Sequence, residues 1–132
     1  MIALDSSALV AILRMEPDAR EFLRALVNAP EKVMSSVNLL ETSLVLVRAT
    51  GDASIWEPLD VFVEESEVEI VAFDSDQASI AREAFLRFGK GRHPARLNFG
   101  DCAAYALAKS RKAPLLFKGG DFLKTDIAAA LG

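Results

Sequence analysis

MIALDSSALVAIL, residues 1–13, is the stretch that decides the fold class. Its first four residues form a short apolar run, which Asp5 and the two serines after it interrupt. Asp and Ser are favourable N-cap residues, and the apolar residues that follow recur at helical spacing. We therefore predict a short strand at residues 1–4 that leads directly into a helix.

The same alternation of short apolar runs and helical patterns continues along the chain. Further strands are predicted at residues 32–35, 68–73 and 115–117, with a last edge strand or turn at 126–130. Helical patterns predict helices at residues 18–27, 53–65, 75–88 and 101–112.

One more helix is predicted between a cap at Ser35 or Ser36 and Gly51. We expect its buried stripe to consist of Val37, Leu40, Leu44 and Val47. Short apolar strands that alternate with helices favour an α/β fold, in which helices cover both faces of a short parallel sheet in three α/β/α layers. A ligand site in such a fold lies beyond the carboxyl ends of the strands.

Composition excludes several classes of protein. Hydrophobic residues make up 52% and charged residues 26% of the 132 residues, which is typical of one packed globular domain. The longest apolar runs are far shorter than the roughly 20 residues of a membrane span. The first residues lack the basic region of a secretory signal, so we expect a cytoplasmic protein. Cys102 is the only cysteine, which excludes an intrachain disulfide and a zinc site of several thiolates; we expect it to be a small buried residue.

Charge is distributed unevenly around a net value of −4. Residues 52–76 contain nine acids and no Lys or Arg, whereas residues 84–100 contain four basic residues, the only histidine and no acid. Each segment is interpretable as a solvated surface. The basic segment is equally compatible with contacts to phosphate groups.

Four acidic residues occupy positions that are typical of functional sites in such a fold. Asp5 and Asp121 follow predicted strands, Asp101 lies in the first turn of a predicted helix, and Glu41 interrupts an otherwise apolar helix. Taken singly, each acid has a structural interpretation as a cap, a turn residue or a surface charge. A carboxylate on a buried side nevertheless needs a partner.

Four motifs in this order resemble those of PIN domains and, more narrowly, of the VapC-type toxins of prokaryotic toxin–antitoxin pairs. They are DSSAL at 5–9, VNLLET at 37–42, NFGDCAAYALA at 98–108 and LLFKGGDF at 115–122. The resemblance covers essentially the whole chain and implies a single PIN domain at residues 1–132. It also implies an endoribonuclease that depends on Mg²⁺ or Mn²⁺, cleaves structured RNA such as transfer RNA, forms a homodimer and is inhibited by a cognate antitoxin.

The resemblance assigns the catalytic metal site to Asp5, Glu41, Asp101 and Asp121. Carboxylate oxygens are hard ligands that suit Mg²⁺ or Mn²⁺, and four carboxylates without a cation would repel one another. Ser7 is expected to support the ligands by hydrogen bonding, and Asp126 is a further supporting candidate for which a structural role is the alternative.

Many relatives carry Asp or Asn where this chain has Gly120, which puts a second metal ion in doubt. The expected RNA contacts are Arg87, Lys90, Arg92, Arg96 and Lys118, which position a phosphate backbone without specifying bases. His93 is a weaker candidate for a general acid or base, and Trp56 and Tyr105 are expected in the core or a dimer interface.

Two other functions remain open from the sequence. One is a non-catalytic module that binds RNA or an antitoxin on the same fold, although retention of all four acids argues against it. The other is a different phosphoryl-transfer enzyme, such as a receiver domain or an aspartyl-phosphate phosphatase. The phosphatase motif requires a second Asp two residues after the first, where this chain has Ser7.

Overall fold

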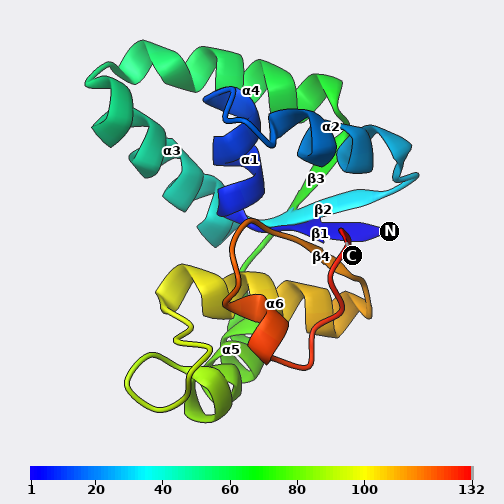
Figure 1. The fold of residues 1–132 in the computed structure, drawn as a ribbon, viewed down its shortest axis with the longest axis vertical. Helices are drawn as coiled ribbons and strands as arrows, with labels where there is room; N and C mark the ends of the chain where they lie inside the picture. The colour runs from blue at the N-terminus through cyan, green and yellow to red at the C-terminus, as the bar shows by residue number, and fades with distance from the viewer. Residues whose placement is uncertain (132) are drawn as a thin grey trace.

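A sheet of parallel strands forms the centre of the computed structural model, which describes residues 1–131 (Figure 1). The strand order is β3-β2-β1-β4. The strands are β1 (Ile2–Leu4), β2 (Lys32–Ser35), β3 (Val68–Val71) and β4 (Leu115–Leu116). Ala3 pairs with Val33 on one side and with Leu115 on the other, so β1 lies inside the sheet.

Helices cover both faces of this sheet. Their bounds are α1 (Ser6–Leu13), α2 (Ala19–Asn28), α3 (Ser36–Thr50), α4 (Trp56–Glu65), α5 (Ser75–Phe88) and α6 (Phe99–Arg111), with short 3₁₀ turns η1 (Ala53–Ile55) and η2 (Phe122–Lys124). Helices α1 to α4 lie above the sheet in Figure 1, and α5 and α6 lie below it. The predicted three-layer α/β/α fold with a short parallel sheet is confirmed.

The strands are apolar on both faces because each face contributes to a separate core. Ile2 and Leu4 pack with α1, α2 and Leu59 of α4, whereas Ala3 between them packs against α5 and α6. Successive strand side chains point to opposite faces, so a strand covered on both sides reads as a continuous apolar run. No helix within residues 1–131 combines the length and apolar character that crossing a membrane requires.

Polar caps mark the points where strands end and helices begin. Asp5 after β1 accepts a hydrogen bond from the backbone N of Ser7, and Ser35 at the end of β2 accepts one from the backbone N of Val37. These caps bond backbone N–H groups that the first helical turn leaves unpaired. As a result α1 and α3 both start at the carboxyl edge of the sheet, and α6 begins at the same side (Figure 1).

The predicted buried stripe of α3 is wrong. Leu40 and Leu44 are 60% and 40% exposed, whereas Asn38, Thr42 and Leu46 are buried. The reason is a polar contact across layers: the Asn38 side chain donates to the backbone oxygen of Gly100 in α6. Helix α3 therefore turns its Asn38 face inward and leaves part of its apolar surface in solvent.

Smaller differences have local causes. Residues 126–130 form no strand: one isolated parallel bridge joins Ala129 to Leu115. Helix α6 starts at Phe99 and not at residue 101, because Asn98 and Asp101 form a reciprocal capping box. The nine acids of residues 52–76 are all exposed, as expected of a solvated surface.

Candidate active site

Asp5 is a buried carboxylate at the carboxyl end of β1. The residue is 4% exposed, and its Oδ2 accepts hydrogen bonds from the backbone N of Ser7 at 3.1 Å and from Ser7 Oγ at 2.5 Å. The buried Oδ1 has no hydrogen-bond partner among residues 1–131. Burial, with smaller contributions from the charges of Asp101 and Glu41, raises the pKa of Asp5 to about 7 against the opposing Ser7 hydrogen bonds.

Glu41 reaches toward the same edge from α3. Its Oε1 accepts hydrogen bonds from Ser6 Oγ and, at 3.4 Å, from Asn38 Nδ2. Ser6 is the first residue of α1, so this carboxylate lies between α1 and α3. The sequence pattern did not indicate Ser6 or Asn38 as partners of Glu41; the one available signal was a polar residue on an apolar helix.

Asp101 lies in the first turn of α6. Its Oδ2 accepts from the backbone N of Asn98 at 3.0 Å, and its own N donates to Asn98 Oδ1 at 2.9 Å. Burial, with smaller contributions from the charges of Glu41 and Asp121, raises the pKa of Asp101 to about 6 against the opposing hydrogen bond from Asn98. Asp101 is thus both a helix cap and a member of a strongly negative cluster.

Asp121 completes this set from the exposed loop after β4. Its charge acts on Asp101, as noted, and Asp101 in turn acts on Asp5. The four predicted acids therefore share one electrostatic site at the carboxyl edge of the sheet. Among the hydrogen bonds and ion pairs within residues 1–131, none joins Lys, Arg or His to any of these four carboxylates.

The residues present fit a hard divalent cation. The buried Oδ1 of Asp5 has no partner within residues 1–131, and burial together with the neighbouring acids raises the pKa of Asp5 and of Asp101. A bound cation would stabilise the ionised form of both carboxylates. As placed in residues 1–131, no three Asp, Glu, His or Cys side chains are close enough together to surround an ion. Binding would therefore require side-chain rotations that bring the carboxylates closer to a common centre.

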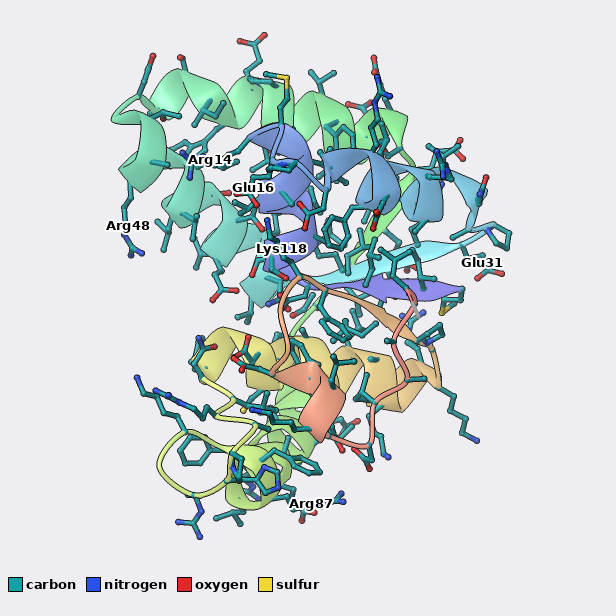
Figure 2. All side chains as sticks on the ribbon, in the orientation of Figure 1. Arg14, Glu16, Glu31, Arg48, Arg87 and Lys118 are labelled. Atoms are coloured by element: carbon teal, nitrogen blue, oxygen red, sulfur yellow. The ribbon has the colours of Figure 1, made fainter. Side chains whose placement is uncertain are left out.

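Ser7 links Asp5 to the loop that follows β4. While its Oγ donates to Asp5, it also accepts a hydrogen bond from the backbone N of Lys118 at 2.9 Å. The loop that leads to Asp121 is thereby attached to the first turn of α1. The Lys118 side chain forms ion pairs elsewhere: Nζ lies 2.6 Å from Glu16 Oε1 and 3.1 Å from Asp18 Oδ1. Figure 2 labels Lys118 and Glu16 beside each other. These bonds raise the pKa of Lys118.

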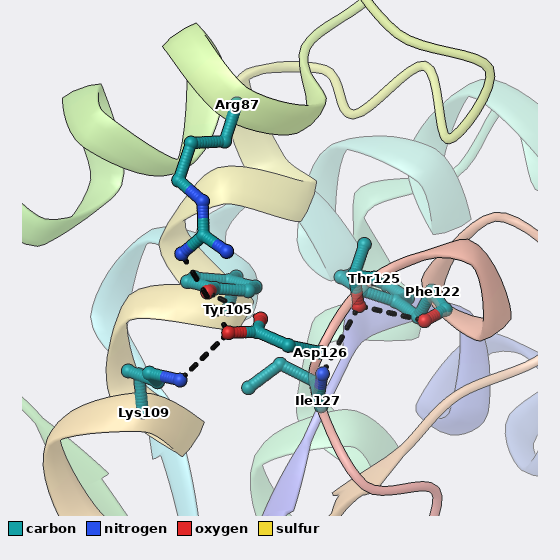
Figure 3. A network of polar contacts seen from close by, with 7 residues as sticks. All are labelled: Arg87, Tyr105, Lys109, Phe122, Thr125, Asp126 and Ile127. Carbon is teal, nitrogen blue, oxygen red and sulfur yellow. Dashed lines mark hydrogen bonds and ion pairs between the residues drawn. The ribbon is translucent and has the colours of Figure 1, made fainter.

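Asp126 lies in a different polar network, shown in Figure 3. It accepts from Tyr105 Oη at 2.6 Å and from Lys109 Nζ at 2.8 Å, and Arg87 lies 3.6 Å away. Partial burial opposes ionisation of Asp126, but the hydrogen bonds from Lys109 and Tyr105 leave its pKa lowered. The structure thus gives Asp126 no hydrogen bond to the four acids and attaches the C-terminal segment to α6 through it.

The basic loop between α5 and α6 is folded on itself. His93 Nδ1 accepts from the backbone N of Ala95 at 3.0 Å, and the His93 ring packs edge-on against Phe88. The side chains of Lys90, Arg92 and Arg96 are exposed on one surface of this loop. Arg87, by contrast, stacks on Phe88 and pairs with Asp126.

Three other residues singled out in the sequence have clear environments. Cys102 is buried, as predicted, and burial raises its pKa to about 11. Tyr105 is a core residue, whereas Trp56 is 41% exposed and donates to the backbone oxygen of Ser43. Phe99, which no sequence pattern marks as a surface residue, is 77% exposed beside Glu41.

Comparison with known proteins gives consistent similarities. A family model described as PIN domain matches residues 2–128. A protein named Ribonuclease VapC from Mycolicibacterium smegmatis is 48% identical over 128 residues, covering 97% of this chain and 98% of that protein. Ribonuclease VapC30 of Mycobacterium tuberculosis is 47% identical over 127 residues, covering 96% of each.

Solved structures share the fold at low sequence identity. The crystal structure of Mycobacterium tuberculosis VapC20, described as a toxin that cleaves the sarcin–ricin loop, has a TM-score of 0.80 at 19% identity and covers 97% of both chains. The DNA-bound VapBC complex from Salmonella typhimurium has a TM-score of 0.73 at 17% identity, covering 97% of this chain and 94% of that one.

Proposed function

Because this chain belongs to the PIN-domain family and, within it, to the VapC ribonucleases, we propose that it is a metal-dependent endoribonuclease toxin. Its substrate is a structured RNA of translation, such as transfer RNA, and its location is the cytoplasm, where that RNA is found. The observation that carries the proposal is the cluster of acids around Asp5, whose buried Oδ1 has no partner within residues 1–131.

Asp5 and Asp101 are the proposed direct ligands of Mg²⁺ or Mn²⁺. Glu41 binds the ion or orients a bound water, and Asp121 acts from the outer side of the site. When bound, the cation activates a water and neutralises charge that develops at the scissile phosphate. Ser7 keeps Oδ2 of Asp5 in two hydrogen bonds, which leaves Oδ1 free to bind.

The RNA backbone is proposed to cross the exposed loop between α5 and α6. Lys90, Arg92 and Arg96 are exposed there, and that loop leads directly into Asp101. Arg87 and Lys118, the other two sequence candidates, are already in ion pairs and would need to exchange an acid for a phosphate. Such contacts position the backbone and do not select a base.

A cognate antitoxin is the proposed inhibitor. A groove that includes Glu41 is also lined by the side chains of Val37, Leu40, Leu44, Arg48 and Phe99. Exposed apolar side chains that adjoin a catalytic site are suited to bind a protein segment. A segment seated there would cover Glu41 and exclude RNA. The proposal includes a homodimer, for which exposed apolar residues of α5 such as Leu86 are available.

Cleavage of end-labelled transfer RNA by the purified protein tests the activity. We expect discrete fragments with Mg²⁺ or Mn²⁺, none with EDTA, and none from an Asp101→Asn variant purified identically. Asp60→Asn, which neutralises an exposed acid of α4, is the matched control and should cleave normally. Equal inactivity of the unmodified and Asp101→Asn proteins with every metal and total cellular RNA would favour the non-catalytic binding module.

A further inference from the structure

Glycine is an unfavourable residue type at position 100, inside the first turn of α6. Gly100 is the second residue of this helix, its backbone is helical, and it is buried. Glycine in a helix is less favourable than alanine, because it loses more conformational freedom on folding. No left-handed backbone angle requires glycine here, since Gly100 is not among the positive-φ residues. Another feature must therefore exclude a side chain.

That feature is the Glu41 carboxylate. A Cβ atom built on Gly100 would lie 2.5 Å from both Oε1 and Cδ of Glu41, and closer still to Oε2. Real Cβ atoms essentially never approach heavy atoms so closely, so a methyl group here must displace Glu41 or α6. The Glu41 carboxylate thus occupies the space that a side chain at position 100 would fill.

Asn38 ties the same two elements together. It is 0% exposed, and its Nδ2 donates to the Gly100 backbone oxygen at 3.0 Å and to Glu41 Oε1 at 3.4 Å. Asn38 lies one helical turn before Glu41, where the two side chains of α3 are neighbours. One amide group therefore fixes both the carboxylate and the helix end that it packs against.

We propose that Gly100 and Asn38 are positioning residues that place the Glu41 carboxylate against the first turn of α6. Gly100 does this through its missing side chain and Asn38 through its amide hydrogen bonds. The inference rests on the proposed function, because it concerns the position of one proposed metal-binding acid. It explains why a helix-disfavouring residue directly precedes Asp101.

Gly100→Ala is the direct test. We expect unfolding at an equal or higher temperature, since alanine favours the helix, together with cleavage reduced about 100-fold, as displacement of a catalytic group by about 1 Å can cause. Mn²⁺ affinity, measured by calorimetry without RNA, should fall in parallel. Asp60→Asn in α4 is again the control and should leave both cleavage and Mn²⁺ affinity unchanged, because this exposed acid lies outside the four-acid site.

A second substitution separates positioning from folding. Glu41→Asp shortens the side chain by one C–C bond, about 1.5 Å, and should weaken Mn²⁺ binding on its own. In the Gly100→Ala background the shorter acid leaves room for the methyl group, so we expect the double variant to bind Mn²⁺ at least tenfold more tightly than Gly100→Ala. Such non-additivity is the signature of two groups in contact.

Several results would overturn the inference. Unchanged Mn²⁺ affinity in Gly100→Ala would do so, and so would strictly additive losses in the double variant. If Gly100→Ala fails to fold, Asn38→Ala supplies the second measurement: it should weaken Mn²⁺ binding, and unchanged affinity would contradict the proposal. Because Mn²⁺ binding is measured without RNA, an unmodified protein that binds Mn²⁺ but cleaves nothing would refute the proposed activity and leave this inference testable.

Discussion

Replacement of Asp5 by Asn should stabilise the metal-free protein at alkaline pH. Asp5 is buried, its Oδ1 has no hydrogen-bond partner within residues 1–131, and the charges of Asp101 and Glu41 disfavour its ionised form. The pKa of Asp5 is higher in the folded protein than in the unfolded chain. Its contribution to the free energy of unfolding is therefore fully present below pH 3.8 and is lost as the pH rises through about 7. Asparagine is neutral throughout and avoids this loss.

The raised pKa of Asp5 also gives the size of the expected change in the free energy of unfolding. At about 1.4 kcal/mol for each pH unit, a rise from 3.8 to about 7 corresponds to about 4 kcal/mol against the ionised form above pH 7. The amide of the introduced asparagine would place an NH₂ group without a partner at the former Oδ1, which costs about 1–3 kcal/mol. We therefore expect a net gain of about 2 kcal/mol at pH 8, which disappears by about pH 5.

Urea unfolding in EDTA, at pH 8 and at pH 5, measures this gain directly. Asp121→Asn is the control, because it removes the same charge from an exposed side chain and should change the free energy of unfolding by less than about 0.5 kcal/mol. Addition of Mn²⁺ should stabilise the unmodified protein and not Asp5→Asn. A loss of stability at pH 8, or an equal gain at both pH values, would refute the account of Asp5.

Three further outcomes are expected. Tyr105→Phe removes the hydrogen bond to Asp126 and should lower the free energy of unfolding by about 1–2 kcal/mol without loss of cleavage; a large loss of cleavage would return Asp126 to the catalytic site. Lys90→Ala combined with Arg96→Ala should weaken RNA binding and its salt dependence while the melting temperature stays constant, as fluorescence anisotropy across a salt series would show. Mn²⁺ should raise the melting temperature of the unmodified protein more at pH 8 than at pH 5, because protons compete for the Asp5 and Asp101 carboxylates at the lower pH; a pH-independent rise would place the ion elsewhere.

Local sequence patterns predicted the layers of this fold because a capping side chain lies at or soon after the end of each of the strands β1, β2 and β3. The Asp5 cap after β1 defines a strand-to-helix transition without any long-range information. The buried face of α3 was mispredicted because this helix is apolar on more than one side. Periodicity does not reveal that Asn38 turns inward to bond Gly100, 62 residues away. Which side of such a helix is buried depends on contacts across layers.

In the candidate site, too, the sequence indicates the acidic residues but not the long-range contacts of their neighbours. Asp5, Glu41 and Asp101 stand out in the sequence because acids at strand ends, in apolar helices and at helix starts need a reason. The partners of Lys118 and Asp126 could not be predicted, since Glu16 and Tyr105 lie far from them in the chain. The role of Gly100 also depends on a side chain from another layer, which sequence alone does not place beside it.

The central claim is that the acids around Asp5 form one cation site. Anomalous X-ray scattering from crystals grown with Mn²⁺ tests it most directly. The account predicts a peak in direct contact with Asp5 Oδ1 and the Asp101 carboxylate, with Glu41 close enough to bind the ion or one of its waters. A peak elsewhere on the molecule, or none here at a saturating Mn²⁺ concentration, would contradict it.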